Sequence, residues 1–156
     1  MLEPKVHLNQ MHIATKGSKI DISSEKKLEN FSKKIIIDLK LGDIFFLFGD
    51  MGVGKTTFVR YLINHLQKKF NQKVTEVTSP TFNIMNEYNV GDFLIKHYDL
   101  YRLNKAIELK ELNLFDKSEK AILFIEWPQI IKQKPRSVFE LYFEYENNYQ
   151  NRFINF

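Results

Sequence analysis

The sequence GDMGVGKT at residues 49–56 decides the fold of this chain. It satisfies the pattern G-x-x-x-x-G-K-[S/T], and Thr57 follows it with a second hydroxyl. Glycines allow the backbone to curl so that several amide N–H groups point at phosphate oxygens, and a helix that starts there adds the positive end of its dipole. The Lys55 ammonium would reach the β- and γ-phosphates of ATP, and the Thr56 hydroxyl would be a ligand of Mg²⁺. The segment therefore predicts a phosphate-binding loop.

The segments on both sides of this loop have the patterns that it requires. Residues 44–48, IFFLF, are apolar without polar alternation, which is typical of a strand buried on both faces of a parallel sheet. After the loop, apolar side chains recur at every fourth position, at Phe58, Leu62, Leu66 and Phe70. This spacing predicts a helix that packs across a sheet. Strand, loop and helix thus follow one another in the required order.

The rest of the chain predicts further elements around this unit. Helices are expected over residues 23–40 and 106–114. Strands are expected over residues 74–77, 82–88, 93–98, 121–125, 138–145 and 152–156. The second and third of these strands would form a hairpin around a turn at residues 89–92. The predicted fold class is α/β: a P-loop NTPase fold whose central sheet is mostly parallel, with an antiparallel hairpin and antiparallel carboxyl-terminal strands, flanked by helices.

Length and composition indicate one cytoplasmic domain. A chain of 156 residues with 44% hydrophobic and 27% charged residues can bury a core of its own. We expect a single ATPase domain over residues 1–156, in which residues 1–22 form an irregular arm with a short strand near residues 12–20. The absence of cysteine excludes disulfide frameworks and Cys-type zinc sites, and no apolar run approaches the roughly 20 residues of a membrane span. A cytoplasmic location without a membrane is therefore the expectation.

The positive charge of the chain gathers beside the loop. The formal net charge is +4 at pH 7, and no acidic residue lies between Asp50 and Glu76. Five basic residues fall in that interval: Lys55, Arg60, Lys68, Lys69 and Lys73. This distribution indicates a phosphate-bearing ligand. It leaves direct contact with a nucleic acid open, because a phosphate-binding loop is itself basic.

Two acids at predicted strand ends are the candidates for catalysis. Glu126 follows the strand at 121–125, at the edge where ligands bind in open α/β sheets, and Asp99 ends the strand at 93–98. In a site of this kind one acid holds Mg²⁺ directly or through water, and a group beside the γ-phosphate positions the attacking water. We assign Asp99 to the metal and Glu126 to the water, with Glu126 as a further candidate metal ligand. From the residues alone, a solvated strand end explains either acid equally well.

Other polar and aromatic residues stay open between function and structure. Thr78, Ser79 and Thr81 form a hydroxyl cluster that could sense a γ-phosphate or simply end a strand. Trp127, the only tryptophan, could stack on a base or a partner, or belong to the core.

Four segments together resemble the TsaE (YjeE) family. They read GDMGVGKTTF at 49–58, TSPTF at 78–82, HYDLYRL at 97–103 and EWP at 126–128, and the resemblance extends from about residue 23 to residue 127. It implies a compact bacterial ATPase that uses ATP and Mg²⁺, hydrolyses ATP weakly, and works with the TsaD and TsaB proteins. Their product would be threonylcarbamoyladenosine beside the anticodon of tRNAs that read codons beginning with adenine. The carbamoyl transfer would belong to the TsaD partner, and contact with tRNA would be indirect.

The resemblance also implies roles for particular residues. The nucleotide contacts would be Gly49, Asp50, Met51, Gly52, Val53, Gly54, Lys55, Thr56, Thr57 and Trp127. The catalytic residues would be Lys55, Asp99 and Glu126, and the metal ligands would be Thr56, Asp99 and Glu126. Met51 and Val53 stand where relatives commonly have Leu and Ala, and Leu28 stands about where relatives often have a threonine near the nucleotide.

Two other functions remain open at this point. A small-molecule kinase would share the loop, with Asp99 or Glu126 activating a substrate hydroxyl, although the sequence lacks the arginine-rich lid segment that small kinases use. A nucleotide-gated binding module without functional turnover would instead dock a partner through the hairpin at 82–98 when ATP is bound.

Overall fold

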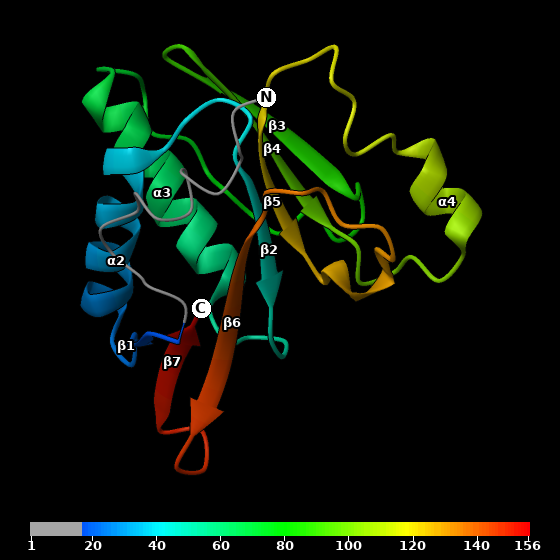
Figure 1. Ribbon diagram of the computed structural model, residues 1–156. Helices are drawn as coiled ribbons and strands as arrows, with labels where there is room; N and C mark the ends of the chain where they lie inside the picture. The colour runs from blue at the N-terminus through cyan, green and yellow to red at the C-terminus, as the bar shows by residue number, and fades with distance from the viewer. Residues whose placement is uncertain (1–16) are drawn as a thin grey trace.

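Seven strands form one mixed sheet within residues 17–156, the part of the chain that the computed structural model describes. Their order is β1-β7-β6-β2-β5-β4-β3 (Figure 1). The strands are β1 (Lys19–Asp21), β2 (Ile44–Phe48), β3 (Met85–Val90), β4 (Phe93–Asp99), β5 (Ile122–Glu126), β6 (Phe139–Glu146) and β7 (Asn151–Asn155). The neighbours β6, β2, β5 and β4 are parallel, whereas β3, β7 and β1 pair antiparallel. The α/β class is thus confirmed, as is the antiparallel hairpin. Of the two predicted carboxyl-terminal strands only β7 is an antiparallel addition, because β6 pairs parallel with β2 and belongs to the central part of the sheet.

Two helices, α2 (Glu25–Asp38) and α3 (Lys55–Lys69), pack against each other and cover one face of the sheet (Figure 1). Each buries one apolar stripe. α2 begins after Ser24, whose hydroxyl accepts a hydrogen bond from the backbone N–H of Lys27. The short helix α4 (Ala106–Glu111) lies on the other side of the sheet. Among the described residues, no helix is long and apolar enough to cross a membrane.

The sheet separates two hydrophobic clusters, and β2 contributes to both of them. Phe45 and Leu47 belong to the cluster under α2 and α3, where Phe45 stacks on Phe124 of β5 with ring centroids 4.8 Å apart. Phe46 belongs to the cluster on the opposite face. The unbroken apolar run is therefore a strand buried on both faces, as predicted. Burying one side chain of this size contributes about 1.5–3 kcal/mol to folding.

Residues 74–77, predicted as a strand, do not form one. The segment follows α3, and the Gln67 side chain accepts a hydrogen bond from the backbone N–H of Thr75 at 3.1 Å. The same side chain donates a second hydrogen bond to the Thr75 hydroxyl at 2.8 Å. The backbone N–H of Thr75 is thus hydrogen-bonded to the Gln67 side chain and is not available to pair with a neighbouring strand. The sheet ends at β3 instead. Only Val77 of this segment is buried, so the prediction was wrong.

The predicted hairpin is present, but its first strand is shorter than expected. β3 begins at Met85 rather than at residue 82, because residues 81–83 form a turn and Ile84 has a left-handed φ of 66°. β3 and β4 are joined by Gly91 and Asp92, within the predicted turn.

The ends of two other predicted segments also differ. Residues 1–16 lie outside the described residues, and with them most of the predicted arm and of its short strand. The last part of that arm contains β1, which overlaps the end of the predicted short strand and pairs with β7, so this part of the arm belongs to the sheet. The helix predicted over 106–114 ends at Glu111 as α4, and Asn113 follows with a left-handed φ of 45°.

Gly49 joins β2 to the glycine-rich loop at a place where no other residue fits. Its φ is 137°, which L side chains rarely adopt, and a Cβ there would lie 2.4 Å from the backbone oxygen of Phe143 in β6. Gly42, before β2, has a φ of 94°, also in the left-handed region, but a Cβ there would meet nothing within 4 Å. A side chain at Gly42 would cause backbone strain alone, whereas one at Gly49 would cause both strain and a clash. Comparing substitutions at the two positions therefore isolates the effect of the clash.

We expect Gly49→Ala to lower the free energy of unfolding by about 2–4 kcal/mol, because both strain and overlap with β6 must be relieved. Gly42→Ala should cost only about 1 kcal/mol, since strain alone acts there. Urea unfolding of both variants measures the difference. Equal losses would show that the close approach of β2 and β6 is not what requires glycine.

Candidate functional site

A pocket of about 200 Å³ lies at the carboxyl ends of β2, β4 and β5. It is lined by Met51, Gly52, Gly54, Lys55, Thr56, Thr57, Ser79, Thr81, Asp99, Tyr101, Glu126 and Trp127. Because β4 and β5 are parallel with Asp99 opposite Glu126, the two acids end their strands side by side. The first turn of α3 brings Lys55 and Thr56 to the same place. The predicted catalytic and metal-binding residues are thus all collected in one pocket.

The glycine-rich loop curls back on itself and holds the Lys55 side chain inside. Gly52 and Gly54 have φ values of 78° and 121°, and Gly54 is the residue from which α3 starts. The Lys55 ammonium, in a residue only 4% exposed, donates to the carbonyl oxygens of Gly49 and, at 2.9 Å, of Asp50. Burial lowers the pKa of Lys55, and the nearby Glu126 and Asp99 charges oppose this shift. The ammonium is therefore a desolvated cation whose direct partners are neutral.

Trp127 forms a wall of the pocket beside this ammonium. Its backbone has a left-handed φ of 57°, and its N–H donates to the carbonyl of Leu47 at 3.3 Å. The Lys55 Nζ lies 4.4 Å from the centre of the Trp127 ring, a cation–π contact. Tyr101 packs on the ring from another side, with centroids 4.8 Å apart. Trp127 is thus half-buried at the pocket edge rather than in the core.

Glu126 lies at the centre of a buried hydrogen-bond network. Its Oε1 accepts a hydrogen bond from the Thr56 hydroxyl at 2.7 Å and lies 2.8 Å from Nε2 of His97. Glu126 and His97 are 3% and 0% exposed. A carboxylate at this depth is stable only with such donors, so the network fixes its position.

Asp99 has a separate set of donors on the other side of the pocket. Its Oδ2 accepts hydrogen bonds from Ser79 at 2.6 Å and Thr81 at 3.0 Å, and its Oδ1 accepts one from the backbone N–H of Tyr101 at 3.0 Å. Two members of the predicted hydroxyl cluster therefore support this acid, while Thr78 is exposed outside the lining. Both oxygens of Asp99 already accept hydrogen bonds from the protein. Asp99 is therefore better arranged to hold a cation through a bound water than to give up these donors and contact the cation directly.

The pocket offers only a few oxygen atoms that could bind a metal ion. Such a partial set suits Mg²⁺, which also binds water and phosphate oxygens, better than an ion whose ligands all come from the protein. Within residues 17–156 no group of three or more His, Cys, Asp or Glu side chains is placed to bind a metal. Mg²⁺ commonly keeps several waters and takes one or two carboxylates together with phosphate oxygens. The Thr56 hydroxyl, Glu126 and Asp99 provide such a partial set. These residues would hold the ion only together with a bound phosphate.

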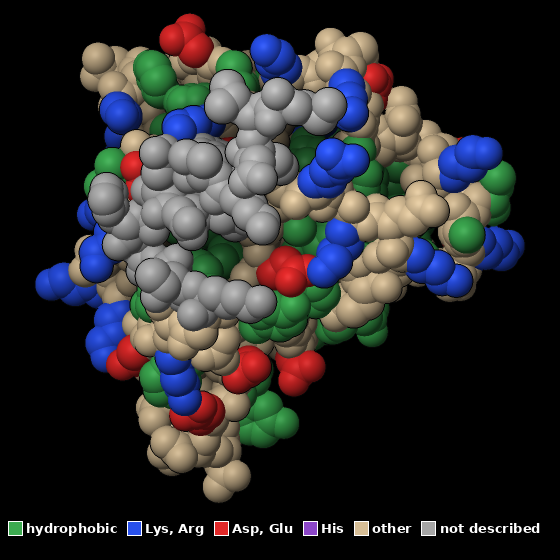
Figure 2. Space-filling view, in the orientation of Figure 1, with side chains coloured by type: hydrophobic (Ala, Val, Ile, Leu, Met, Phe, Trp, Pro, Cys, Tyr) green, Lys and Arg blue, Asp and Glu red, His purple; other side chains and the backbone are tan. Residues whose placement is uncertain are grey.

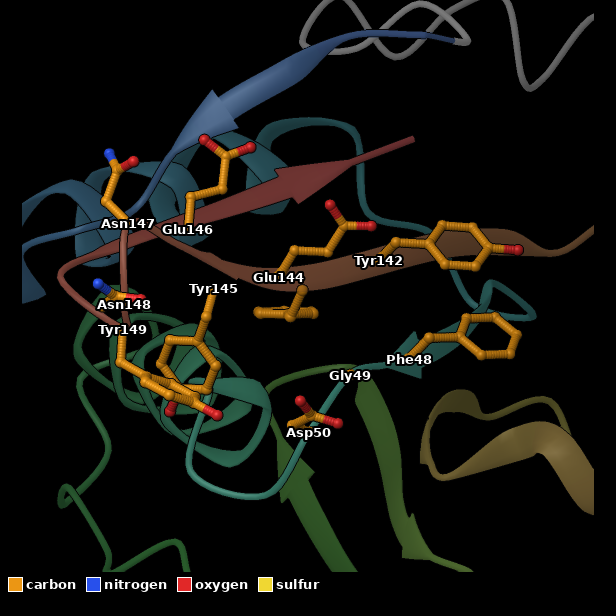
Figure 3. Close-up of a pocket in the computed structure, with 11 residues that line it drawn as sticks. Phe48, Gly49, Asp50, Tyr142, Glu144, Tyr145, Glu146, Asn147, Asn148 and Tyr149 are labelled. Carbon is orange, nitrogen blue, oxygen red and sulfur yellow. The ribbon is translucent and has the colours of Figure 1, made fainter.

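A larger pocket, of about 550 Å³, lies on the other side of the loop (Figure 3). Gly49 and Asp50 line this pocket rather than the smaller one, and β6 with the turn after it supplies most of the rest. Its side chains include Asp50, Glu144 and Glu146, and Figure 2 shows acidic groups gathering over β6 and β7. Because its lining among the described residues, unlike that of the smaller pocket, includes no basic side chain to offset the repulsion between carboxylates and phosphate, the larger pocket does not suit a triphosphate.

Two residues that the sequence associates with the nucleotide, Val53 and Leu28, line neither pocket. Val53, predicted as a nucleotide contact, is fully buried in the core, so only its backbone could serve a ligand. Leu28 is buried too, and its Cδ2 lies 3.5 Å from where a Cβ of Gly54 would be. It packs beneath the loop instead of facing the smaller pocket.

The structure adds Tyr101 and His97 to the predicted site. Tyr101 lines the pocket and contacts Trp127; it lies in the HYDLYRL segment that carries part of the family resemblance, but the sequence predicts no role for it. His97 had a usable signal. It stands two residues before Asp99 in one strand, and side chains at that spacing lie on the same face of a sheet.

Comparisons with known proteins agree on one family. The family model described as "Threonylcarbamoyl adenosine biosynthesis protein TsaE" matches residues 22–154. Two relatives named tRNA threonylcarbamoyladenosine biosynthesis protein TsaE are each 41% identical to this chain. The one from Rickettsia typhi aligns over 111 residues, 71% of this chain and 74% of its own length. The one from Borreliella burgdorferi aligns over 115 residues, 71% of this chain and 78% of its own length.

A solved structure gives the same picture for the fold. The crystal structure of YdiB from Bacillus subtilis superposes with a TM-score of 0.66 and 25% identity, covering 90% of this chain and 84% of that one. The matches extend through the carboxyl-terminal strands, beyond the segment that carries the four sequence motifs. This chain belongs to the TsaE family of threonylcarbamoyladenosine biosynthesis proteins.

Proposed function

We propose that this protein binds ATP with Mg²⁺ in the smaller pocket and hydrolyses it slowly, as an accessory protein required for threonylcarbamoyladenosine formation in tRNA. Its partners would be the TsaD and TsaB proteins, with the carbamoyl transfer carried out by TsaD. The observation that carries the proposal is the buried Lys55 ammonium at the amino-terminal end of α3, next to the Thr56–Glu126 hydrogen bond.

Phosphate binding follows from the electrostatics of Lys55. The ammonium is desolvated, and two carbonyl oxygens and an aromatic ring are its direct partners. A phosphate group would supply the full negative charge that these neutral partners lack. The free N–H groups at the start of α3 and the positive end of its dipole favour the same anion. The larger pocket, with its carboxylates, offers neither contribution.

The chemistry of hydrolysis would be divided between the residues around this phosphate. Thr56 would bind Mg²⁺ directly and Asp99 would hold it through a bound water, and the ion when bound would neutralise charge developing on the phosphate oxygens. Glu126 would orient the attacking water, because two donors hold its Oε1 and Oε2 is then the oxygen available to that water. Lys55 would hold the γ-phosphate in line with it.

The composition of the pocket supports slow turnover. Its lining among the described residues includes Lys55 as the single basic side chain and no arginine. Arginine contributes strongly to phosphoryl transfer where it reaches the transition state. Arg102 lies near the pocket in sequence, but its guanidinium stacks over the exposed Phe82 ring at 4.8 Å. Hydrolysis by this chain alone would therefore lack one stabilising charge, which a partner could supply.

An indirect relation to tRNA is also part of the proposal. On the face drawn in Figure 2, basic side chains lie mainly over the upper and right-hand parts and are separated from one another by uncharged side chains, so they form no continuous basic surface among the described residues of this face. A nucleic-acid footprint would need such a surface. The partner complex would then bring the tRNA.

We expect Lys55→Ala to weaken ATP binding by at least about 100-fold, because a desolvated cation that contacts phosphate is removed. Lys69→Ala, at the exposed carboxyl-terminal end of the same helix, should leave the affinity unchanged. Isothermal titration with ATP and Mg²⁺ measures both. Equal affinities for the two variants would place the phosphates elsewhere.

Glu126→Ala should keep ATP affinity but lower the rate of hydrolysis by about 100-fold or more, because the residue proposed to orient water is lost. The measurement is release of labelled phosphate at saturating Mg²⁺, with and without the TsaD–TsaB pair, which should stimulate the unmodified protein. Transfer of the label to a metabolite instead of water would contradict this function and favour a kinase. Unimpaired hydrolysis in the variant would remove Glu126 from the reaction.

Depletion of the protein in its own cells should reduce threonylcarbamoyladenosine in tRNAs that read codons beginning with adenine. Nucleoside analysis of bulk tRNA measures the loss, and re-expression of unmodified protein, but not of Lys55→Ala, should reverse it. An unchanged level of the modified nucleoside after depletion would rule out a required role in its formation.

A further inference from the structure

We propose that His97 is a positioning residue for Glu126: its Nε2–H holds Oε1 of that carboxylate from beneath the pocket. The inference rests on the proposed hydrolysis for its effect on rate, but the pairing itself is observed independently of any activity. His97 does not line the pocket, so it would act through Glu126 and not on the nucleotide.

The sheet places His97 directly under the site. His97 and Asp99 lie on the same face of β4, the face that α2 and α3 cover, and Phe124 and Glu126 lie on the same face of the neighbouring β5. His97 pairs in register with Phe124 and Asp99 with Glu126. The His97 ring therefore forms the last buried layer between the apolar core and the two acids.

The hydrogen bond has one donor assignment that fits the chemistry. An ionised carboxylate only accepts, so Nε2 must carry the hydrogen and donate to Glu126 over 2.8 Å. Nδ1 of the same ring is buried, and no partner among the described residues reaches it. An unpartnered lone pair costs less there than an unpartnered N–H, which favours the ring with hydrogen on Nε2 alone.

A structural role does not explain a histidine at this position. The ring is 0% exposed and leaves one nitrogen without a partner among the described residues, so an apolar side chain of similar volume would fill the space without that penalty. The Nε2–Glu126 contact is the one polar interaction recorded for the ring within residues 17–156. Among the described residues, the hydrogen bond to Glu126 is thus the interaction that offsets the free-energy cost of burying the imidazole.

Holding Oε1 has a specific consequence for the carboxylate. The second donor to Oε1 is the Thr56 hydroxyl, the group that the proposed function assigns to Mg²⁺. The Thr56 hydroxyl can keep donating its hydrogen to Oε1 while its oxygen binds Mg²⁺, but its position then follows the ion, whereas His97 is held by the sheet and is the donor whose position does not depend on the metal. The orientation of Oε2 toward water would then depend on His97.

The test compares two substitutions at this position. His97→Leu fills the volume without a donor, whereas the amide of His97→Gln can donate from nearly the same place as Nε2. We expect His97→Leu to lower kcat for ATP hydrolysis about 10- to 100-fold while ATP affinity stays within about twofold, and His97→Gln to remain within about threefold of the unmodified kcat. A purely structural role would not be rescued by glutamine.

A double-mutant cycle shows whether His97 acts through Glu126. In the Glu126→Ala background, adding His97→Leu should change kcat by less than about twofold. Gln67→Leu is the matched control, because Gln67 is also a buried polar residue with side-chain hydrogen bonds, at the far end of α3. It should lower stability without altering kcat. Additive losses in the cycle, or an unimpaired His97→Leu, would overturn the proposal.

Imidazole ¹⁵N chemical shifts test the pairing even if the protein proves not to hydrolyse ATP. The expected result is a His97 ring with hydrogen on Nε2, whose Nε2 resonance moves in Glu126→Ala and stays in Gln67→Leu. Hydrogen on Nδ1, or a ring insensitive to Glu126→Ala, would overturn the proposal. Absence of hydrolysis with an intact pairing would instead overturn the proposed function alone.

Discussion

The parallel pairing of β2 with β5 on one side and β6 on the other is the constraint on which the site depends. It fixes the point where β2 ends, so the glycine-rich loop must turn within the narrow space beside β6, where the backbone of Phe143 leaves room for glycine only. The same pairing places Glu126 next to the loop, because Leu47 and Glu126 lie in register. Loop shape and acid position thus have one common cause.

The site is polar, yet it is built onto the most apolar part of the molecule. Lys55, Asp99 and Glu126 are each at most 4% exposed and stand directly above side chains such as Phe58 and Phe124. Charges at this depth are costly unless partners surround them. Here the partners are hydroxyls, carbonyls, an imidazole and an indole ring, which orient the charged groups without cancelling them. In the proposed function these charged groups would be available to a phosphate and its metal.

The sequence predicts most of this arrangement because the decisive residues are local. A run such as 44–48 and a loop such as 49–56 contain their own patterns, and an acid at the end of a buried strand is placed by the strand. Prediction fails where distant residues compete. Residues 74–77 have strand-forming side chains, but Gln67 takes the backbone N–H of Thr75, and no local pattern reports that. Likewise, Tyr101 gains its place only through contact with Trp127.

The two pockets beside the loop show why a volume alone does not identify a site. The larger pocket has aromatic walls, with Phe48 stacked on Tyr142 at 4.6 Å, but its charges are negative. The smaller one has less room and contains the Lys55 ammonium, the start of α3 and both candidate acids. Since phosphate recognition depends on desolvated positive charge and oriented N–H groups, the smaller pocket is the one suited to chemistry. Tyr101 in its lining is an exposed side chain, so the edge of this pocket lies at the molecular surface, where the partner of the proposed function would have to reach it.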